Sequence, residues 1–222
     1  MKNSIVLFLI FLSINLCAQK DSLQVGEPYW EDQLYLNISF NALTNQPKKI
    51  DKSGFSFGFS VGYIKDIPIL NNGKMAIGIG LGYSFDSFNH SLKVVEGNPT
   101  GFKIDKSVTN NKLKIHNIEM PIQFRLRTST VNSYSFWRLY TGVKLSYNLK
   151  NTFSYIESSS KVSLSNLEEY HKLQTGLTLS AGYKTFNLYI YYGLTPILKN
   201  TYLKENKIKS NIVRVGLSFY LL

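Results

Sequence analysis

The sequence predicts an all-β fold: an eight-stranded antiparallel transmembrane β-barrel with short periplasmic turns and longer extracellular loops. Three observations support this prediction. The chain begins with a segment typical of export. Apolar residues then alternate with small or polar ones in eight separate runs. Only 18% of the 222 residues are charged, whereas about a quarter is usual in a soluble domain. With 44% hydrophobic residues, the chain can bury the core of one domain, which argues against disorder.

The N-terminal segment has the features of a secretory signal peptide. A basic residue precedes the apolar run 5–12, and the small residue Ala18 offers a cleavage site, so residues 1–18 are predicted to be removed. Eight apolar residues are too few for a membrane-spanning helix, which needs about 20. Cys17 raises the alternative of a lipoprotein, in which this cysteine would carry the lipid. A small residue normally precedes a lipidated cysteine, whereas the larger Leu16 precedes Cys17. Cleavage leaves a mature chain without cysteine, which cannot rely on disulfides.

The first four runs each combine a large apolar face with a face of small or polar residues. Residues 34–42 alternate aliphatic residues and Phe with Tyr, Asn and Ser, and residues 55–63 alternate mostly aromatic residues with Ser and Gly. Residues 76–85 alternate Ile, Leu, Tyr and Phe with Ala, Gly and Ser. Residues 118–127 alternate apolar residues with Glu, Pro, Gln and Arg. Each run matches the 9–11 residues or so that a tilted membrane strand requires.

The last four runs repeat this pattern. Residues 137–147 alternate mainly apolar residues with Arg, Tyr, Gly, Lys and Ser, and residues 173–183 alternate mainly apolar residues with Gln, Gly, Thr and Ser. Residues 187–194 alternate Leu, Ile and Tyr with Asn, Tyr and Gly. Residues 213–221 alternate Val, Leu and Phe with Arg, Gly, Ser and Tyr. Eight such runs predict eight strands, and an even number returns both termini to the same side of the membrane.

The composition of the second face distinguishes a membrane barrel from a soluble sandwich. A solvent-exposed strand face would carry many Lys, Glu and Thr residues, whereas this face is mostly Gly and Ser. Small residues suit the crowded interior of a narrow barrel, and large apolar residues suit a lipid-facing wall. The few charges on the inward face are predicted to pair with one another and to plug the lumen rather than line a channel. These structural lumen charges are Glu119, Arg125, Arg138, Lys144 and Arg214.

The connections predict which end of the barrel faces outward. Short connections alternate with long ones, as in outer-membrane barrels. The short connections are 66–74, 128–133 and 184–185, and the long ones are 86–111, 151–169 and 196–210. The mature chain therefore divides into a periplasmic N-terminal segment (19–32) and an outer-membrane β-barrel (33–222), with both termini periplasmic.

Aromatic residues near the ends of the runs predict two interfacial girdles. The periplasmic girdle comprises Tyr63, Trp137, Tyr183 and Phe219. The outer girdle comprises Phe40, Phe55, Tyr83, Phe85, Tyr147 and Tyr192. The last run also has a glycine followed by two spaced apolar residues, the pattern of a signal read by the barrel-assembly machinery. Its key positions are Gly216, Phe219 and Leu221.

No catalytic, cofactor-binding or metal site is predicted. The histidines His90, His116 and His171 lack a carboxylate or second histidine at metal-ligand spacing. His90 lies close to Asp86, Ser87 and Ser91 at the outer end of a strand, and a small lipid-modifying enzyme with a Ser–His–Asp site is therefore an alternative. A polar start to a loop explains the same residues without catalysis, and the prediction is a non-enzyme.

Basic loops account for much of the formal net charge of +11. Export and the period of two argue against nucleic acid as the partner. On the outer face the loop lysines could contact lipopolysaccharide phosphates or an acidic partner, or simply be solvated. These lysines are Lys48, Lys49, Lys52, Lys199, Lys204, Lys207 and Lys209.

Several stretches resemble the small outer-membrane β-barrel family of Bacteroidota that includes PorT. The segments 118–125 (IEMPIQFR), 139–147 (LYTGVKLSY) and 191–197 (YYGLTPI) resemble the broad family. The segments 29–35 (YWEDQLY) and 62–68 (GYIKDIP) resemble the PorT-type branch more specifically.

The resemblance implies an accessory role in the type IX secretion system, which exports proteins with C-terminal signals and supports gliding motility. It implies protein partners in a secretion complex, with no catalytic residue and no cofactor. For Glu119 and Pro121 the resemblance implies only a structural role. A free-standing barrel that binds lipid or ligand through its loops is the alternative.

Overall fold

The computed structural model describes residues 32–45, 55–70, 73–95, 97, 101–105, 107–128, 137–203 and 206–221. The predicted signal peptide (1–18) and nearly all of the predicted periplasmic segment (19–32) lie outside these residues, as do Lys48, Lys49, Lys52 and Lys204. Within the described residues the regular elements are strands, and there is no helix long and apolar enough to cross a membrane.

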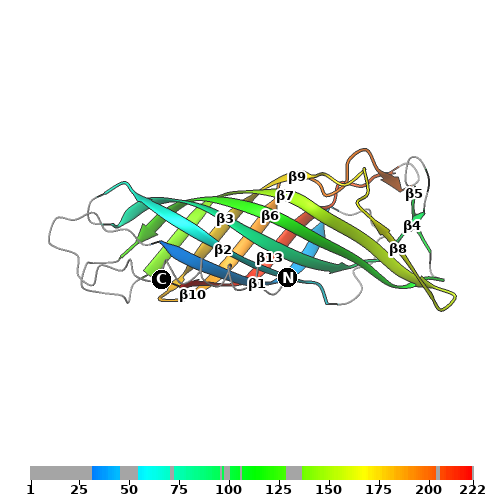
Figure 1. Ribbon diagram of the computed structural model, residues 1–222, viewed down its shortest axis with the longest axis horizontal. Coiled ribbons are helices and arrows are strands. Elements are labelled where there is room, and N and C mark those ends of the chain that lie inside the picture. The colour runs from blue at the N-terminus through cyan, green and yellow to red at the C-terminus, as the bar shows by residue number, and fades with distance from the viewer. Residues whose placement is uncertain are drawn as a thin grey trace, which may run out of the picture.

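Eight antiparallel strands close into a barrel, which confirms the predicted fold class. Neighbouring strands pair in the order β1, β2, β3, β6, β7, β9, β10 and β13, and β13 pairs with β1 to close the cylinder. Figure 1 shows these strands tilted along the barrel. Their bounds are β1 Gln33–Thr44, β2 Phe57–Pro68, β3 Met75–Asn89, β6 Thr109–Arg127, β7 Trp137–Glu157, β9 Leu173–Tyr183, β10 Phe186–Gly193 and β13 Asn211–Leu221.

Side-chain exposure alternates along the barrel strands with the period of two seen in the sequence. In β1, Leu34 is 53% exposed and Tyr35 only 3%. The exposed positions of the barrel strands are mostly large apolar residues, whereas the inward positions carry most of the Asn, Ser, Arg and Gly and several tyrosines. Because a soluble protein would bury this apolar wall, the inverted distribution is that of a barrel in lipid.

Lumen glycines make room for the large side chains that fill the barrel. A Cβ atom on Gly82 would lie 2.0 Å from the hydroxyl of Tyr35, and one on Gly176 would lie 2.4 Å from the ring of Tyr191. The small residues of the inward face are therefore the complement of buried tyrosines from other strands, and the lumen is packed rather than open.

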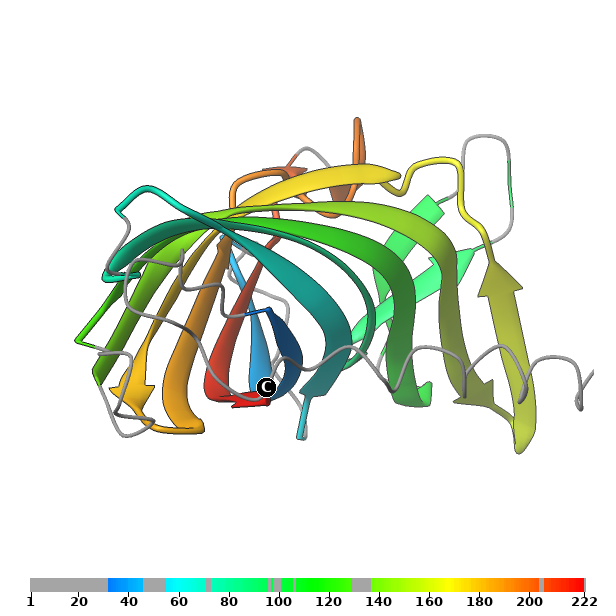
Figure 2. The same cartoon turned by 60° about the vertical axis from the view of Figure 1, so that its left-hand side comes forward.

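Several barrel strands run further than the alternation predicted, β6 and β7 by the most. β6 begins at Thr109 and β7 continues to Glu157, and the two remain paired nearly throughout. The predicted long connections also contain short strands: β4 Leu92–Val95, β5 Gly101–Ile104, β8 Ser160–Ser165, β11 Tyr202–Leu203 and β12 Asn206–Lys207. β8 pairs with the extension of β7, and β4 and β5 form a hairpin. These elements lie at the end of the barrel away from the C-terminus (Figure 1). Figure 2 shows β4, β5 and β8 projecting beyond the curved sheet of barrel strands.

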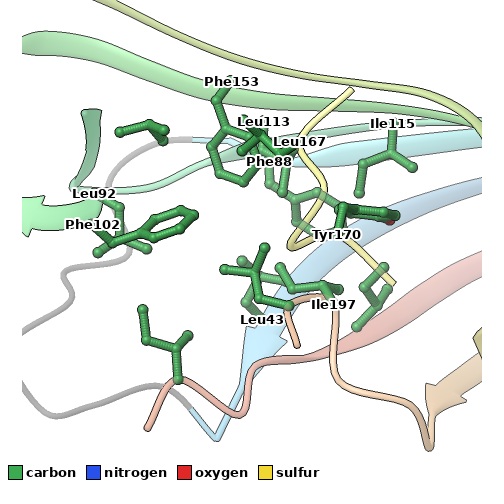
Figure 3. Packing of buried hydrophobic residues seen from close by; sticks show 14 of the residues in the cluster. Leu43, Phe88, Leu92, Phe102, Leu113, Ile115, Phe153, Leu167, Tyr170 and Ile197 are labelled. Carbon is green, nitrogen blue, oxygen red and sulfur yellow. The ribbon is translucent and has the colours of Figure 1, made fainter. Parts of the chain in front are cut away.

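The long connections fold inward to form a hydrophobic cap over that end of the barrel. Phe88 of β3, Phe153 of β7 and Ile212 of β13 are almost fully buried against loop residues such as Tyr170 and Leu198. Figure 3 shows this packing, in which strand ends and loops contribute to one cluster. The full cluster comprises Leu43, Phe88, Leu92, Val94, Phe102, Leu113, Ile115, Phe153, Leu167, Tyr170, Tyr189, Tyr191, Ile197, Leu198, Leu203, Ile208 and Ile212.

Candidate functional site

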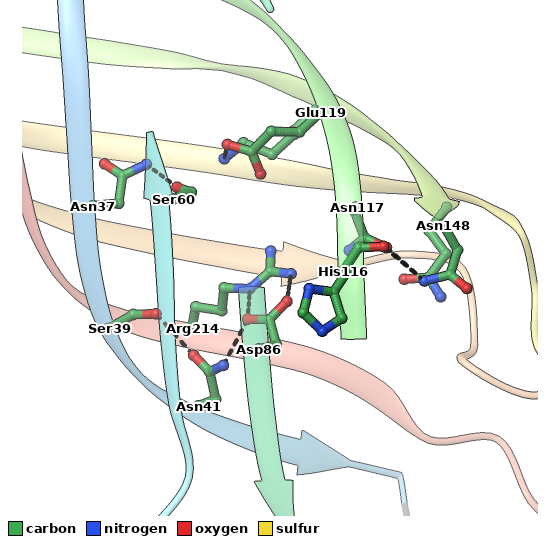
Figure 4. Close-up of polar contacts among 12 residues, drawn as sticks. Asn37, Ser39, Asn41, Ser60, Asp86, His116, Asn117, Glu119, Asn148 and Arg214 are labelled. Atoms are coloured by element: carbon green, nitrogen blue, oxygen red, sulfur yellow. Dashed lines mark hydrogen bonds and ion pairs between the residues drawn. The ribbon is translucent and has the colours of Figure 1, made fainter. Parts of the chain in front are cut away.

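The lumen carries a buried ion pair between Asp86 of β3 and Arg214 of β13, which lie on non-adjacent strands. Arg214 Nε donates to Asp86 Oδ1 at 2.9 Å, and Nη2 donates to Oδ2 at 2.7 Å. Asn41 Nδ2 of β1 donates to the same Oδ1 at 2.7 Å and accepts from Ser39. Figure 4 shows these groups converging inside the barrel. This bidentate, charge-assisted arrangement ties strands together across the lumen.

A second buried pair joins Glu119 of β6 to Lys144 of β7. Lys144 Nζ and the hydroxyl of Tyr35 both donate to Glu119 Oε1, each at 2.8 Å. The Lys144 ammonium also lies 5.8 Å from the centre of the Tyr35 ring and 5.4 Å from that of Tyr189. Aromatic faces and one carboxylate therefore compensate the charge of this buried lysine.

A third cluster lies near the short-turn end of the lumen, around Asp66 of β2. Both Arg125 and Arg127 of β6 form ion pairs with its carboxylate, Arg127 at 2.6 Å. Arg127 Nε also donates to the carbonyl of Gly73 at 2.6 Å, which links the cluster to the β2–β3 turn. Arg138 of β7, which pairs with Arg127 of β6, donates to the carbonyl of Lys184 in the β9–β10 turn.

The structure places all five predicted lumen charges inside the barrel, with exposed fractions of 5% or less. Glu119 and Lys144 form an ion pair with each other, but Arg125 and Arg214 pair with aspartates that lie in predicted connections. Asp66 and Asp86 lie within β2 and β3 because those strands run past the predicted ends. Continuing the alternation by three residues in β2 and by one residue in β3 places both carboxylates on the inward face.

Between the two central ion pairs, the described residues leave far less space than a pore. A cavity of about 10 Å³, room for a single water molecule, lies between the two central ion pairs and is bordered by Ser84, Glu119 and Arg214, among others. Buried aromatic rings pack against the lumen guanidinium groups: that of Arg125 lies 4.6 Å from the centre of the Tyr140 ring, and that of Arg214 lies 4.3 Å from the centre of the Tyr191 ring. The geometry is that of a plugged barrel.

The alternative Ser–His–Asp site is not assembled. Asp86 accepts hydrogen bonds from Arg214 and Asn41 inside the lumen, whereas Nδ1 of His90 accepts from the backbone N–H of Leu92 at 3.1 Å in the cap. No hydrogen bond among the described residues joins Asp86 to His90. Burial in the cap lowers the pKa of His90 to about 4, so the imidazole is neutral at physiological pH.

The other two histidines contact oxygen atoms in separate parts of the structure. Nδ1 of His116 lies 2.6 Å from the Tyr83 hydroxyl, and that of His171 lies 2.7 Å from the Pro196 carbonyl oxygen. In the part of the chain that the structure describes, no three His, Cys, Asp or Glu side chains gather as metal ligands.

The predicted assembly-signal residues lie on β13, the strand that closes the barrel. Gly216 faces the lumen side of the seam, where a Cβ atom would lie 2.0 Å from the Ile38 carbonyl oxygen of β1. Phe219 pairs with Leu36 across the seam and packs edge-on against Phe186, with ring centres 5.2 Å apart. Leu221 is 49% exposed on the outer wall.

Most of the chain matches a known protein family. Residues 17–199 match the family described as outer membrane protein beta-barrel domain. The chain belongs to this family. As an outer-membrane barrel of the family, it presents its exposed apolar wall to lipid, and its buried charges line the inside. No curated protein matches the chain.

Similar solved structures include two of Ail, the attachment invasion locus protein of Yersinia pestis. The first is 15% identical with a TM-score of 0.35 and covers 86% of this chain and 97% of its own. The second, a complex with the heparin analogue sucrose octasulfate, is 14% identical with a TM-score of 0.36 and covers 86% and 99%. A chain from work on the asymmetric conductivity of engineered proteins is 7% identical, has a TM-score of 0.23 and covers 87% and 100%.

Proposed function

We propose that this outer-membrane barrel is a non-conducting, non-enzymatic scaffold, an accessory component of the type IX protein secretion and gliding machinery. The plugged lumen is the observation that carries the scaffold proposal. Ion pairs occupy its centre, and the hydrophobic cap closes one end. A barrel that passes nothing through its interior acts through its turns, its loops and its outer wall.

The secretion role is supported by the resemblance of the chain to the PorT-type branch at residues 29–35 and 62–68. The described residues of these two stretches, from Asp32 onward in the first, meet in the structure. Asp32 accepts hydrogen bonds from the hydroxyl of Tyr63 at 2.6 Å and from the backbone N–H of Asp66 at 3.0 Å. The start of the barrel is thus hydrogen-bonded to β2 beside the third ion-pair cluster. In this proposal the periplasmic segment (19–32) that precedes the barrel binds larger partners.

In this proposal the short turns and both termini face the periplasm, and the capped end faces outward. β1 begins and β13 ends at the short-turn end, where the β2–β3, β6–β7 and β9–β10 connections also lie. The barrel-assembly machinery would read Gly216, Phe219 and Leu221 at the closing strand. Arg127 and Arg138 hold the turns at Gly73 and Lys184 to the barrel, beside the surface that a partner would meet.

Two measurements test the two parts of the proposal separately. In planar lipid bilayers the purified protein should show no single-channel conductance, and steady open-channel currents would contradict the scaffold. In a deletion strain, proteins with type IX signals should stay cell-associated and return to the medium on complementation. Unchanged export would contradict the secretion role and favour a free-standing barrel that binds lipid or ligand through its loops.

Partner binding can be localised with the same strain. Variants of the segment 19–31 in an otherwise intact barrel should lose both co-purifying proteins and export. The matched control removes charge at the opposite end, with Lys199→Gln and Lys207→Gln on the exposed surface of the β10–β13 connection. Equal loss of partners in both variants would argue against the periplasmic segment as the attachment point.

A further inference from the structure

A lysine patch lies on the outer wall immediately beyond the outer aromatic girdle. On β6, Lys112, Lys114 and His116 face outward, alternating with the buried Asn111, Leu113 and Ile115. Lys150 of β7 pairs directly with His116, so it lies beside Lys114 on the same face of the barrel. We name Lys112, Lys114 and Lys150 the wall patch; it is distinct from the loop lysines that the sequence analysis singled out.

A β-bulge turns Lys150 toward the outside. The pairing of β6 with β7 shifts between His116 and Asn117, which pair with Lys150 and Asn148 and leave Leu149 as the extra residue. Without the bulge, the alternation would point Lys150 into the lumen; with it, both Leu149 and Lys150 are exposed.

Buried asparagines hold the bulge in place. The Asn148 side chain donates to the carbonyls of His116 and Lys150, at 3.1 and 3.2 Å, and to the side chain of Asn117 at 2.9 Å (Figure 4). Asn151 in turn donates to Asn148 at 2.9 Å. The outward position of Lys150 is therefore built into the strand.

The girdle fixes the depth of the wall patch in the membrane. His116 pairs with Phe85 of β3, and its imidazole ring is hydrogen-bonded to the hydroxyl of Tyr83. Lys114 lies two residues further along β6, about 7 Å beyond the aromatic level. Aromatic girdles mark the boundary between hydrocarbon and headgroups, so the lysine ammonium groups reach the layer of lipid headgroups.

The wall patch has positive charge without internal compensation. Among the described residues, none of its lysines forms an ion pair, whereas Lys93 pairs with Glu157 and Asp105, and Lys144 with Glu119. Opposite Lys114, Thr152 is hydrogen-bonded at 3.0 Å to Ser165 of β8, which adds hydroxyl donors to the same row. Ammonium and hydroxyl donors without a carboxylate form the chemistry that binds phosphate.

We propose that the wall patch binds the phosphate groups of a phosphorylated outer-leaflet lipid, of which lipid A is the type. Its position directly above an apolar wall selects a ligand with acyl chains rather than a soluble anion, since the chains lie along Ile118 and Met120 while the phosphates reach the lysines. The proposal rests on the outward orientation of the capped end and is independent of the secretion role.

The test places the full-length mature protein in phosphatidylcholine nanodiscs that contain lipid A or the same lipid with both phosphates removed. Native mass spectrometry then counts the lipid retained. At about 1 kcal/mol for each lysine near a charged membrane surface, the three lysines should favour the phosphorylated lipid by about a hundredfold. The variant Lys112→Gln, Lys114→Gln, Lys150→Gln should lose this preference.

Three controls make the result specific. The variant Lys199→Gln, Lys207→Gln, Lys209→Gln removes the same charge from the loops and should keep the preference. Replacing the wall patch lysines by Arg should also keep it, and heat-modifiability on gels should show that every variant is folded. Retention of lipid A by the Gln variant of the wall patch would overturn the proposal. Displacement of the lipid by millimolar inorganic phosphate would also overturn it, because the site would then bind a soluble anion.

Discussion

Replacing Asp86 by Asn would remove one charge from the buried Asp86–Arg214 pair at almost constant volume. Both side chains are nearly inaccessible, with exposed fractions of 1% and 6%. Arg214 would keep its position but lose the carboxylate that accepts two of its hydrogen bonds, at 2.9 and 2.7 Å. Each hydrogen bond to a charged group contributes about 1.5–3 kcal/mol, and an uncompensated buried charge costs about 3–5 kcal/mol. We therefore expect Asp86→Asn to lower the free energy of unfolding by about 3–5 kcal/mol.

The double variant Asp86→Asn, Arg214→Gln separates the ion pair from the loss of packing. Two neutral amides can hydrogen-bond across the same gap, so the double variant should recover most of the stability, and the coupling energy should exceed about 2 kcal/mol. Urea unfolding in lipid vesicles, followed by tryptophan fluorescence, measures both quantities.

An exposed ion pair supplies the matched control. Lys65 and Asp32 are 3.8 Å apart and 60% and 33% exposed, so Lys65→Gln should cost less than about 1 kcal/mol. If Asp86→Asn costs no more than Lys65→Gln, or if the double variant equals the sum of its single variants, the lumen pair does not hold the barrel together as argued.

Three further predictions concern the lumen and the cap. Gly176→Ala would force a Cβ atom against the Tyr191 ring and should destabilise the barrel by about 1–3 kcal/mol; adding Tyr191→Ala should remove most of that clash, and strictly additive unfolding energies would contradict it. The folded pKa of His90 is depressed to about 4 from 6.5, so the stability it contributes is complete above pH 6.5 and falls by up to about 3 kcal/mol as pH drops to 4. Hydrogen exchange in β4 and β5, corrected for intrinsic rates, should therefore speed up over that window, and should do so less in His90→Gln. Phe153→Ala should loosen the cap by about 3–5 kcal/mol and expose its loops to protease while the barrel keeps its heat-modifiability; a protease-resistant variant would contradict this account of the cap.

The strand number, the lipid-facing residues and the position of the lumen charges followed from local pattern. A residue such as Arg214 alternates with apolar neighbours, and an exported chain offers only lipid or lumen to the two faces of such a strand. Leu34 and Tyr35 were assigned to opposite faces for the same reason, and their exposed fractions of 53% and 3% agree with that assignment.

Strand ends were harder to predict because composition changes where strands leave the lipid. Past the girdle the outward positions of β6 become lysines and the inward ones become apolar, as at Leu113 and Ile115, so the alternation reverses its polarity. A polar outward face is typical of a loop, and the predicted connections 86–111 and 151–169 therefore include parts of β6 and β7. The hydrophobic cap was not predicted for the same reason, and because its residues come from many separate segments of the chain.

The amino-acid sequence by itself determined the all-β barrel, its lipid-facing wall and the charges inside it, because alternation is a local property of each strand. Only the tertiary structure decided which charges meet. Asp86 and Arg214 are 128 residues apart in the chain, and the bulge that turns Lys150 outward depends on contacts with a neighbouring strand. Closure of the sheet sets the register of every strand against its neighbours, and that register brings distant side chains together across the lumen.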